Sequence, residues 1–536
     1  MNIRLATADD ASRWLELFRA TFGEQHPART VYSESWIAEQ LIPLSGHETW
    51  VSESSSRLES SVSFLTPSSK VAAGPIINLG RNLHRSESIV NGSAETLLNA
   101  INEIAAQRFQ SVVTRIQAHG NSQQILYENA GYMCVGFQPL KHQLQNRVGM
   151  LFYMRPEADW VRSNPRSVVS QAFAEVAEMA TIVLSRLRLP TPRIIADDII
   201  GYPLQTDLTI TSSTFEGFEE SREQSRNSNP PIEIFSPFNL GHGLMRISSP
   251  QPCRALLCVD HGRTVGGLLF RFDEMDKCAR IVDAFATDGM SMGAMLARTL
   301  KLAEDHLGAV YTEVDLLSTA SRLLKTTEQL GFVPVAYLPG FGGRKDARVD
   351  TVKLAKFNMP YSAETSGLTR HAHGVVEIVD RCFDNQRMGL ATIKLLRPLA
   401  MFAGLGDGEM RKILRLFTQR FYRVGEPVFA KGDNGNEAYI VLRGQIDILL
   451  EPNSKPVASL SNGKIFGELA FLDGGPRSTF AIAAQPSILL VVQQAAFLDL
   501  ARREPSLGMV VMRNIAVDLT GKLRAADVAI ATHRLG

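Results

Sequence analysis

The sequence predicts a multidomain α+β protein in which two mixed α/β domains precede a C-terminal β-roll with flanking helices. A chain of 536 residues exceeds a single hydrophobic core, because domains usually contain roughly 100 to 200 residues. Strand-like and helical segments alternate over 1–155 and again over 236–360, which is typical of layered α/β structure. Dense strand signals with regular glycines then occupy 396–536. We expect a helical linker and loop at 156–235 and a helical linker at 361–395.

Composition narrows the possible environments and partners. Lys plus Arg number 56 and Asp plus Glu 55, so the net charge of +1 predicts no nucleic-acid partner. No apolar run approaches the roughly 20 residues that a membrane-spanning helix requires, and the N-terminus lacks a signal-peptide pattern. The 5 cysteines are scattered without a CxxC pair, which predicts neither a metal site nor a disulfide framework. We therefore expect a cytoplasmic protein.

Local patterns predict several elements inside these blocks. Strands are expected at Ile76–Leu79 and Val112–Ile116, with a helix at Ala94–Phe109 between them. The polar segment Glu219–Pro231 ends in two prolines, which predicts a loop. Asp260–Arg263 lies between two apolar runs and predicts a hairpin turn.

The most specific motif lies in the C-terminal block. It reads Phe466-Gly467-Glu468-Leu469-Ala470, followed by Pro476-Arg477-Ser478-Thr479. The segment resembles the phosphate-binding cassette of the cyclic-nucleotide-binding domain family, found in protein kinase A regulatory subunits and the catabolite activator protein. The resemblance covers about 396–530, and it implies that these residues bind cAMP or cGMP as a regulatory effector.

Each role fits the chemistry of a cyclic phosphodiester, which is a compact monoanion on a ribose. A helical turn beginning near Gly467 would aim free backbone amides at the anion, and glycine permits close approach. Arg477 would add a forked, charge-assisted contact, while Glu468 would accept the 2′-hydroxyl hydrogen bond. Ser478 follows the arginine in binders of either nucleotide, and we favour cAMP. The helix expected at Leu507–Ala526 would close over the base.

The first block carries a second resemblance. His119-Gly120-Asn121-Ser122-Gln123-Gln124-Ile125-Leu126-Tyr127, followed by Gly131-Tyr132, resembles a segment of the GCN5-related N-acetyltransferase (GNAT) fold. The resemblance implies that Tyr127 protonates the departing thiolate of coenzyme A and that Asn121 lies near the pantetheine arm. Gly92, Ser93 and Ala94 would form the loop that holds the pyrophosphate of acetyl-CoA. Ile89 stands where that family has Gln or Arg.

The third block resembles a second, degenerate GNAT-like domain through Leu323–Pro334. Its phosphate loop would begin at Asp288, an acidic residue that repels a pyrophosphate, and Leu324 stands at the expected position of the acid. Glu313 and Asp315 share one face of a predicted strand. The two carboxylates are either a general base for an amine substrate or structurally paired groups.

Three functional hypotheses follow. The first is an N-acetyltransferase, gated by a cyclic nucleotide, that acts on a protein lysine or a small amine. The second is a non-catalytic nucleotide sensor whose GNAT-like domains form an interaction scaffold. The third is a receptor whose first domain binds an acyl-CoA without turnover.

Overall fold

The computed structural model describes residues 1–24, 26, 28–42, 47–65, 76–143, 146–156, 166–168, 171–191, 199–228, 233–234, 253–344, 347–357, 359, 367–414, 416–452 and 454–534. The chain forms two compact units. Unit 1 comprises Met1–Glu328 and Phe332–Phe383, and unit 2 comprises Gln329–Gly331 and Asp384–Gly536. The expected block boundaries at 235/236 and 360/361 lie outside the described residues.

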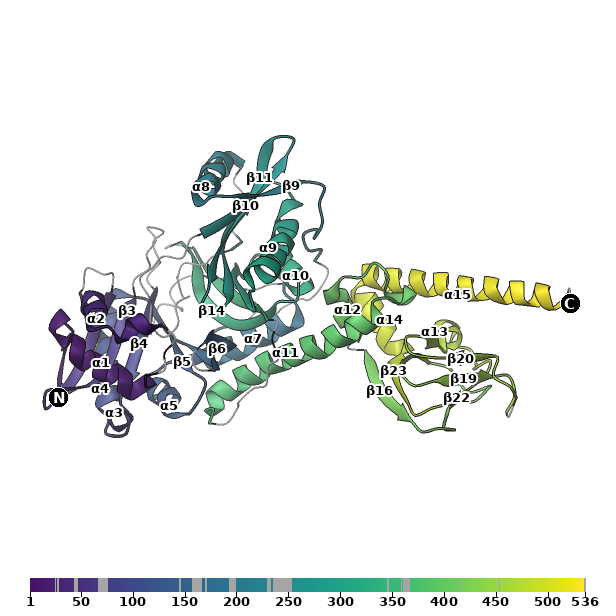
Figure 1. Cartoon of the computed structure of the whole chain (residues 1–536), viewed down its shortest axis with the longest axis horizontal. Coiled ribbons are helices and arrows are strands. Elements are labelled where there is room, and N and C mark those ends of the chain that lie inside the picture. The colour runs from purple at the N-terminus through teal and green to yellow at the C-terminus, as the bar shows by residue number, and fades with distance from the viewer. Residues whose placement is uncertain are drawn as a thin grey trace. The chain divides into compact units, whose positions relative to one another are not determined.

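The first half of unit 1 is a sheet with helices between its strands (Figure 1). Its strands are β1 (Asn2–Leu5), β2 (His47–Ser54), β3 (Arg57–Leu65), β4 (Ile76–His84), β5 (Ser111–Gln117), β6 (Met133–Gln143) and β7 (Arg147–Pro156). Its helices are η1 (Ala8–Asp10), α1 (Ala11–Phe22), η2 (Arg29–Tyr32), α2 (Glu34–Leu41), α3 (Ser86–Val90), α4 (Ser93–Arg108) and α5 (Ser122–Asn129).

The second half of unit 1 has its own set of strands. They are β9 (Thr209–Ser213), β10 (Cys253–Asp260), β11 (Arg263–Asp273), β12 (Cys278–Ala286), β13 (Tyr311–Leu317), β14 (Val333–Arg344) and β15 (Ala347–Phe357). Its helices are α8 (Phe215–Gln224), η4 (Ser225–Ser228), α9 (Ser291–Leu307) and α10 (Ser321–Gln329). Between the halves lie β8 (Arg166–Ser167), which pairs with β15, and α7 (Ala174–Arg186).

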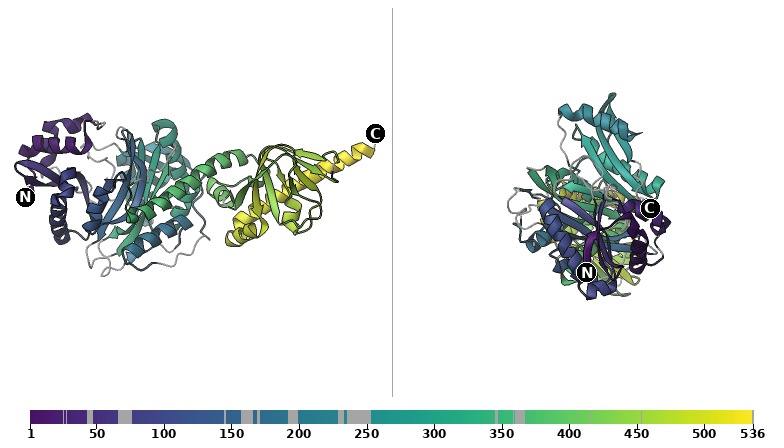
Figure 2. Two further views of the ribbon diagram at one scale, coloured as in Figure 1. Left: turned by 90° about the horizontal axis from the view of Figure 1, so that it is seen from below. Right: turned by 90° about the vertical axis from the view of Figure 1, so that its left-hand side faces the viewer.

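The two halves have the same strand order. The first runs β1-β2-β3-β4-β5-β7-β6, and the second, from the other edge of the sheet, runs β9-β10-β11-β12-β13-β15-β14. In each half, the fourth and fifth strands in chain order pair in parallel and the other neighbours are antiparallel. Unit 1 therefore consists of two halves with the same topology. Figure 2 shows the chain from two further directions.

The halves join through β6 and β14, where Gly136 pairs with Ala336. A Cβ atom at Gly136 would lie 2.2 Å from the Cβ of Ala336 and 2.6 Å from the carbonyl oxygen of Val335. Glycine is required here because the two backbones approach so closely. This contact makes one continuous sheet of 15 strands.

Hydrophobic periodicity explains how helices pack in the first half. Trp14, Leu15 and Phe18 of α1 are almost fully buried and pack against strand residues that include Val51 and Leu83. The observed helix α4 and strand β5 agree with the predicted segments to within one residue. At the predicted hairpin, Asp260 pairs with Arg263, and His261 and Gly262 have φ of 43° and 79°, as a tight two-residue turn requires.

The loop predicted over Glu219–Pro231 is wrong for its first part, which belongs to helix α8 and η4. Thr214 caps the helix, because its hydroxyl accepts a hydrogen bond from the Gly217 amide. Phe218 is fully buried, and it packs with its ring centroid 5.5 Å from that of Phe285. One buried aromatic residue and a cap therefore stabilise a helix that consists mostly of polar and charged residues. Pro231 lies outside the described residues.

Unit 2 contains two four-stranded antiparallel sheets, ordered β16-β23-β18-β21 and β17-β22-β19-β20. The strands are β16 (Phe417–Tyr422), β17 (Pro427–Phe429), β18 (Glu437–Arg443), β19 (Ile446–Leu449), β20 (Ala458–Leu460), β21 (Ile465–Phe466), β22 (Phe480–Ala483) and β23 (Ser487–Gln493). The helices are η5 (Ala400–Phe402), α12 (Asp407–Leu414), α13 (Glu468–Asp473), α14 (Gln494–Arg503) and α15 (Pro505–Arg534). This architecture fits the predicted β-roll.

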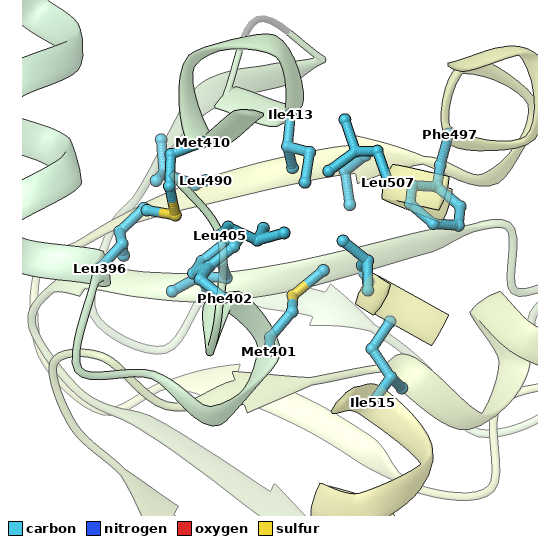
Figure 3. Packing of buried hydrophobic residues seen from close by; sticks show 14 of the residues in the cluster. Leu396, Met401, Phe402, Leu405, Met410, Ile413, Leu490, Phe497, Leu507 and Ile515 are labelled. Carbon is cyan, nitrogen blue, oxygen red and sulfur yellow. The ribbon is translucent and has the colours of Figure 1, made fainter. Parts of the chain in front are cut away.

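A hydrophobic cluster packs the helices of unit 2 on its strands (Figure 3). Met401 and Phe402 contribute from η5, while Leu507 and Ile515 contribute from α15. The cluster also contains Leu396, the last residue of α11 (Arg370–Leu396), a helix that begins in unit 1. The end of the connecting helix and the last helix of the chain therefore share one core.

Candidate functional site

The predicted cassette connects β21 to β22 in unit 2. Strand β21 ends at Phe466, and helix α13 begins at Glu468 after Gly467, whose φ is 76°. A Cβ atom at Gly467 would lie 2.7 Å from Nη1 of Arg477 and 3.1 Å from the Tyr439 ring. Position 467 therefore requires glycine for its left-handed backbone and for the space that Arg477 occupies.

Arg477 is buried beside this turn, with 5% of its surface exposed. Its Nη1 and Nη2 atoms donate hydrogen bonds to the carbonyl oxygens of Gly467 and Glu437, each at 2.9 Å. The guanidinium lies 4.4 Å from the centroid of the Phe429 ring, a cation–π distance. Within the described residues its buried Nε atom has no hydrogen-bond partner. The site thus holds a buried cation whose Nε donor is unused.

Glu468 provides a carboxylate at the first residue of α13. Only 8% of the residue is exposed, and its Oε1 atom accepts a hydrogen bond of 2.6 Å from Nζ of Lys522 on α15. Lys522 also contacts Asp518, at 3.0 Å, and donates to the carbonyl oxygen of Ile465, at 3.3 Å. Burial favours the neutral amine, but the hydrogen bonds to Glu468 and Asp518 raise the pKa of Lys522 above its usual value. The ammonium therefore stays charged at neutral pH.

The arrangement suits a small anion that also carries a hydroxyl group. The first backbone amides of α13 have no acceptor within the helix, and they lie at its positive end. Arg477 supplies a charge-assisted donor, and Glu468 supplies an acceptor. Residues 419–504 match the family described as cyclic nucleotide-binding domain. Unit 2 contains a cyclic nucleotide-binding domain.

Several similar proteins each align with about a quarter of the chain. The cyclic AMP receptor protein of Thermus thermophilus is 35% identical over 133 residues, which are 24% of this chain and 60% of that relative. Glutaminase 2 of Bradyrhizobium diazoefficiens is 32% identical over 24% of this chain and 21% of its own length. The crystal structure of Thermus thermophilus catabolite activator protein is 33% identical in sequence over the aligned part. The alignment covers 25% of this chain and 63% of that chain, with a TM-score of 0.23. The chain therefore spans less than two thirds of the length of these relatives.

The other predicted residues of the cyclic nucleotide-binding domain differ in their exposure. Phe466 and Ala470 are each 4% exposed, which makes them part of the core that supports the turn. Leu469 is 57% exposed, Ser478 is exposed and Thr479 is half-buried. These three side chains can contact a ligand, whereas Phe466 and Ala470 position the backbone.

Sequence reasoning missed two partners of the cassette. Gly435 packs so tightly that a Cβ atom there would lie 2.1 Å from Ala470 and 3.1 Å from Nε of Arg477. Its place after the Lys431-Gly432-Asp433 turn was the available signal. Lys522 gave no signal, because it follows Glu468 by 54 residues.

The candidate acid of the first half, Tyr127, is fully buried in α5. Its ring centroid lies 5.2 Å from that of Tyr132 and 6.3 Å from that of His84 at the end of β4. The Tyr127 hydroxyl and both ring nitrogens of His84 have no hydrogen-bond partner within the described residues. Burial raises the pKa of Tyr127 well above its usual value and lowers the pKa of His84 to about 4. Both groups are therefore neutral at pH 7.

The predicted pyrophosphate loop begins helix α4. Gly92 has a φ of 82°, Ser93 is the first helical residue and Ala94 is fully buried. The Ser93 amide donates to Oδ1 of Asn91, so one amide at this helix end is already paired. Asn121 precedes α5, where its carbonyl oxygen accepts a hydrogen bond from the Ile125 amide.

The second half places different groups at the equivalent positions. Oδ1 of Asp288 accepts hydrogen bonds from the amides of Met290 and Ser291, so a carboxylate caps the start of α9. The amide of Phe332 donates to the Thr327 carbonyl, as the amide of Tyr132 donates to that of Tyr127. Thr327 is therefore the counterpart of Tyr127, and the alignment that placed Leu324 there is wrong.

Glu313 has the environment of a structural carboxylate. It is fully buried, forms an ion pair with Arg280, and accepts hydrogen bonds of 2.9 Å from Lys141 and 2.8 Å from Gln138. Burial opposes ionisation, but Arg280 and Lys141 hold its pKa well below the usual value. Asp315 likewise pairs with Lys353. These contacts favour paired carboxylates over the general base that the sequence also suggested for Glu313.

The described residues show neither a metal centre nor a membrane span. In that part of the chain, no three His, Cys, Asp or Glu side chains gather as ligands for a metal ion. Among the described helices, none combines the length and apolar character needed to cross a bilayer.

Proposed function

We propose that the cyclic nucleotide-binding domain binds cAMP, with cGMP as the second candidate, and that this ligand regulates an acyl-CoA-dependent N-acyltransferase in the first half of unit 1. The observation that carries the first part is Arg477, a buried guanidinium with an unused Nε donor beside the amide end of α13. Two similar proteins are named for cAMP, the receptor protein of Thermus thermophilus and a kinase regulatory subunit of Mycosarcoma maydis, 32% identical over 19% of each chain.

Isothermal titration with cAMP and with cGMP tests nucleotide binding. We expect heat of binding for the full chain and none for Arg477→Glu, because the substitution replaces the phosphate donor with a repelling carboxylate. Arg443→Glu makes the same charge change at an exposed position of β18 and should bind as the wild type does. The absence of heat from the wild type with either nucleotide at millimolar concentration would refute the proposal.

The transferase part rests on the first half of unit 1. The parallel pairing of β4 with β5 covers Ile76–Leu79 and Ser111–Thr114, while β4 continues to His84. Beyond the paired part of these two strands, their backbone groups can form hydrogen bonds with an extended chain that contains amides, such as the pantetheine arm of acetyl-CoA. Unpaired buried groups on His84 and Tyr127 support a ligand in this region, because such groups are rare without a partner.

In the proposed reaction the amine of a protein lysine or small molecule attacks the thioester carbon. The C–N bond forms as the C–S bond breaks, water takes the proton that the amine loses, and Tyr127 donates its proton to the leaving thiolate and regains one from water. Burial raises the pKa of Tyr127, so the phenol carries its proton at neutral pH, as a proton donor must. The second half lacks this group, since Thr327 replaces it and Asp288 caps α9. We infer a supporting, non-catalytic role for the second half.

The coupling is proposed to follow α11. Near its start, the Thr369 hydroxyl donates to Oε1 of Glu128 at 2.5 Å, and the Thr369 amide donates to Oε1 of Gln124 at 3.0 Å. Both acceptors lie on α5, the helix of Tyr127. At its other end Leu396 packs in the cluster that contains α15. A continuous helix with these two attachments can transmit a nucleotide-dependent movement.

Two measurements separate the transferase from a scaffold. Acetyl-CoA at 100 times its dissociation constant should stabilise the protein by about 2.7 kcal/mol against thermal unfolding. Tyr127→Phe should keep that stabilisation and slow thiol release from acetyl-CoA in the presence of an amine by about 100-fold or more. Absent stabilisation would favour the scaffold, and stabilisation without thiol release would favour an acyl-CoA receptor.

A further inference from the structure

We propose that Lys522 of α15 is a positioning residue for the nucleotide site, which holds Glu468 in place for the ribose 2′-hydroxyl and fastens α15 to the cassette. The inference rests on the nucleotide binding proposed above. It adds a residue from outside the cassette that determines how strongly the site prefers a ribose over a 2′-deoxyribose.

The contacts of Lys522 explain why it can act in this way. An ammonium has three N–H donors, and three oxygens lie around this one. They belong to Glu468, at 2.6 Å, to Asp518, at 3.0 Å, and to the carbonyl group of Ile465, at 3.3 Å. Ile465 is in β21, directly before the turn, and Glu468 is directly after it. The ammonium of Lys522 therefore forms hydrogen bonds with the cassette on both sides of Gly467.

The carboxylate of Glu468 retains an acceptor for the ligand. Its Oε1 atom takes the ammonium, and within the described residues its Oε2 atom accepts no hydrogen bond. A carboxylate is a charged acceptor, and it bonds a hydroxyl more strongly than a neutral acceptor does. Because Lys522 holds Oε1, the orientation of Oε2 is also set, and Oε2 can accept a hydrogen bond from the ribose hydroxyl.

The same ion pair connects the site to α15. The first part of this helix is anchored in the hydrophobic cluster through Leu507, Val511 and Ile515. Lys522 lies beyond these anchors, and the side chain of Glu468 is 11% exposed. A ligand that orders Glu468 consequently favours the position of α15 in which Lys522 reaches it.

Titration of cAMP and 2′-deoxy-cAMP against matched variants tests the inference. We expect the wild type to prefer cAMP, and Lys522→Gln to lose roughly tenfold of that preference, because the hydroxyl then meets a disordered carboxylate. Lys522→Arg should retain most of the preference. Lys464→Gln removes a lysine from an exposed position beside Ile465 and should leave both affinities unchanged.

A second measurement identifies the route. In a Glu468→Gln background, Lys522→Gln should change the preference no further, because the lysine acts through that carboxylate. Equal weakening of both nucleotides by Lys522→Gln would overturn the inference, since a purely structural lysine would not discriminate between them. So would a further loss in the Glu468→Gln background. A wild type that binds neither nucleotide would refute the proposed function itself, which is a different result.

Discussion

Lys141 of β6 and Glu313 of β13 form an ion pair of 2.9 Å whose side chains are 1% and 0% exposed. The two residues belong to different halves of unit 1 and are 172 positions apart. Arg280 pairs with the same carboxylate, and Nζ of Lys141 also lies 2.9 Å from Sγ of Cys278. Besides the backbone contact at Gly136, the repeats thus share buried charges that require both halves.

Removing the central carboxylate should destabilise unit 1. Glu313→Gln leaves Lys141 and Arg280 buried with an uncompensated charge, and losing one partner of a buried pair costs about 3–5 kcal/mol. Urea unfolding should show this loss. Glu274→Gln removes an ion pair in which the side chain of Glu274 is 72% exposed, and it should change the stability little. A Glu313→Gln protein of normal stability that has lost thiol release would instead restore the general-base interpretation.

Glycine at position 467 should be essential for nucleotide binding. In Gly467→Ala the Cβ atom would meet Arg477 at 2.7 Å, so the guanidinium must leave its place, and titration should show at least about tenfold weaker binding of cAMP. Gly474→Ala is the matched control, because Gly474 has a similar φ of 69° but a Cβ atom there would meet nothing within 4 Å. Equal losses in both variants would show that backbone strain, and not displacement of Arg477, causes the effect.

The sequence was informative where the function needs neighbouring residues. The three residues proposed to meet the ligand, Gly467, Glu468 and Arg477, lie within one short segment, so the cassette was recognisable. Lys522 and Lys141 meet their partners only through folding, and no local pattern marks them. The helix at Phe215–Gln224 was missed for a related reason, since its polar composition hides one buried aromatic residue and a cap.

The pH dependence of stability should identify His84 as a buried neutral group. Its pKa falls from 6.5 to about 4 on burial, so the unfolded chain binds a proton between these values and the folded chain does not. The contribution of neutral His84 to the free energy of unfolding is complete above pH 6.5. It is lost as the pH falls to 4, a change of about 3 kcal/mol. Urea unfolding at pH 7.5 and pH 5 should show a smaller difference for His84→Gln than for the wild type.

His261 supplies the control for that experiment. Its side chain is 97% exposed at the β10–β11 turn, so His261→Gln should keep the wild-type difference between the two pH values. If His84→Gln also keeps the full difference, His84 takes up a proton in the folded protein and is not the neutral partner that we place beside Tyr127.

The link between α11 and α5 should carry the response of unit 1 to nucleotide. Thr369→Val removes the hydroxyl that donates to Glu128 and accepts from the Ala372 amide in the first turn of α11. It keeps the backbone bond to Gln124, so the fold should persist while the attachment loosens. Affinity for cAMP should stay unchanged, but the cAMP-dependent change in amide hydrogen exchange of α5 should shrink. Thr181→Val, which removes an exposed hydroxyl from α7, should leave that change intact. A full response in Thr369→Val would mean that the signal reaches α5 by a route other than this hydrogen bond, because the hydroxyl would then contribute nothing to the coupling free energy between the two sites.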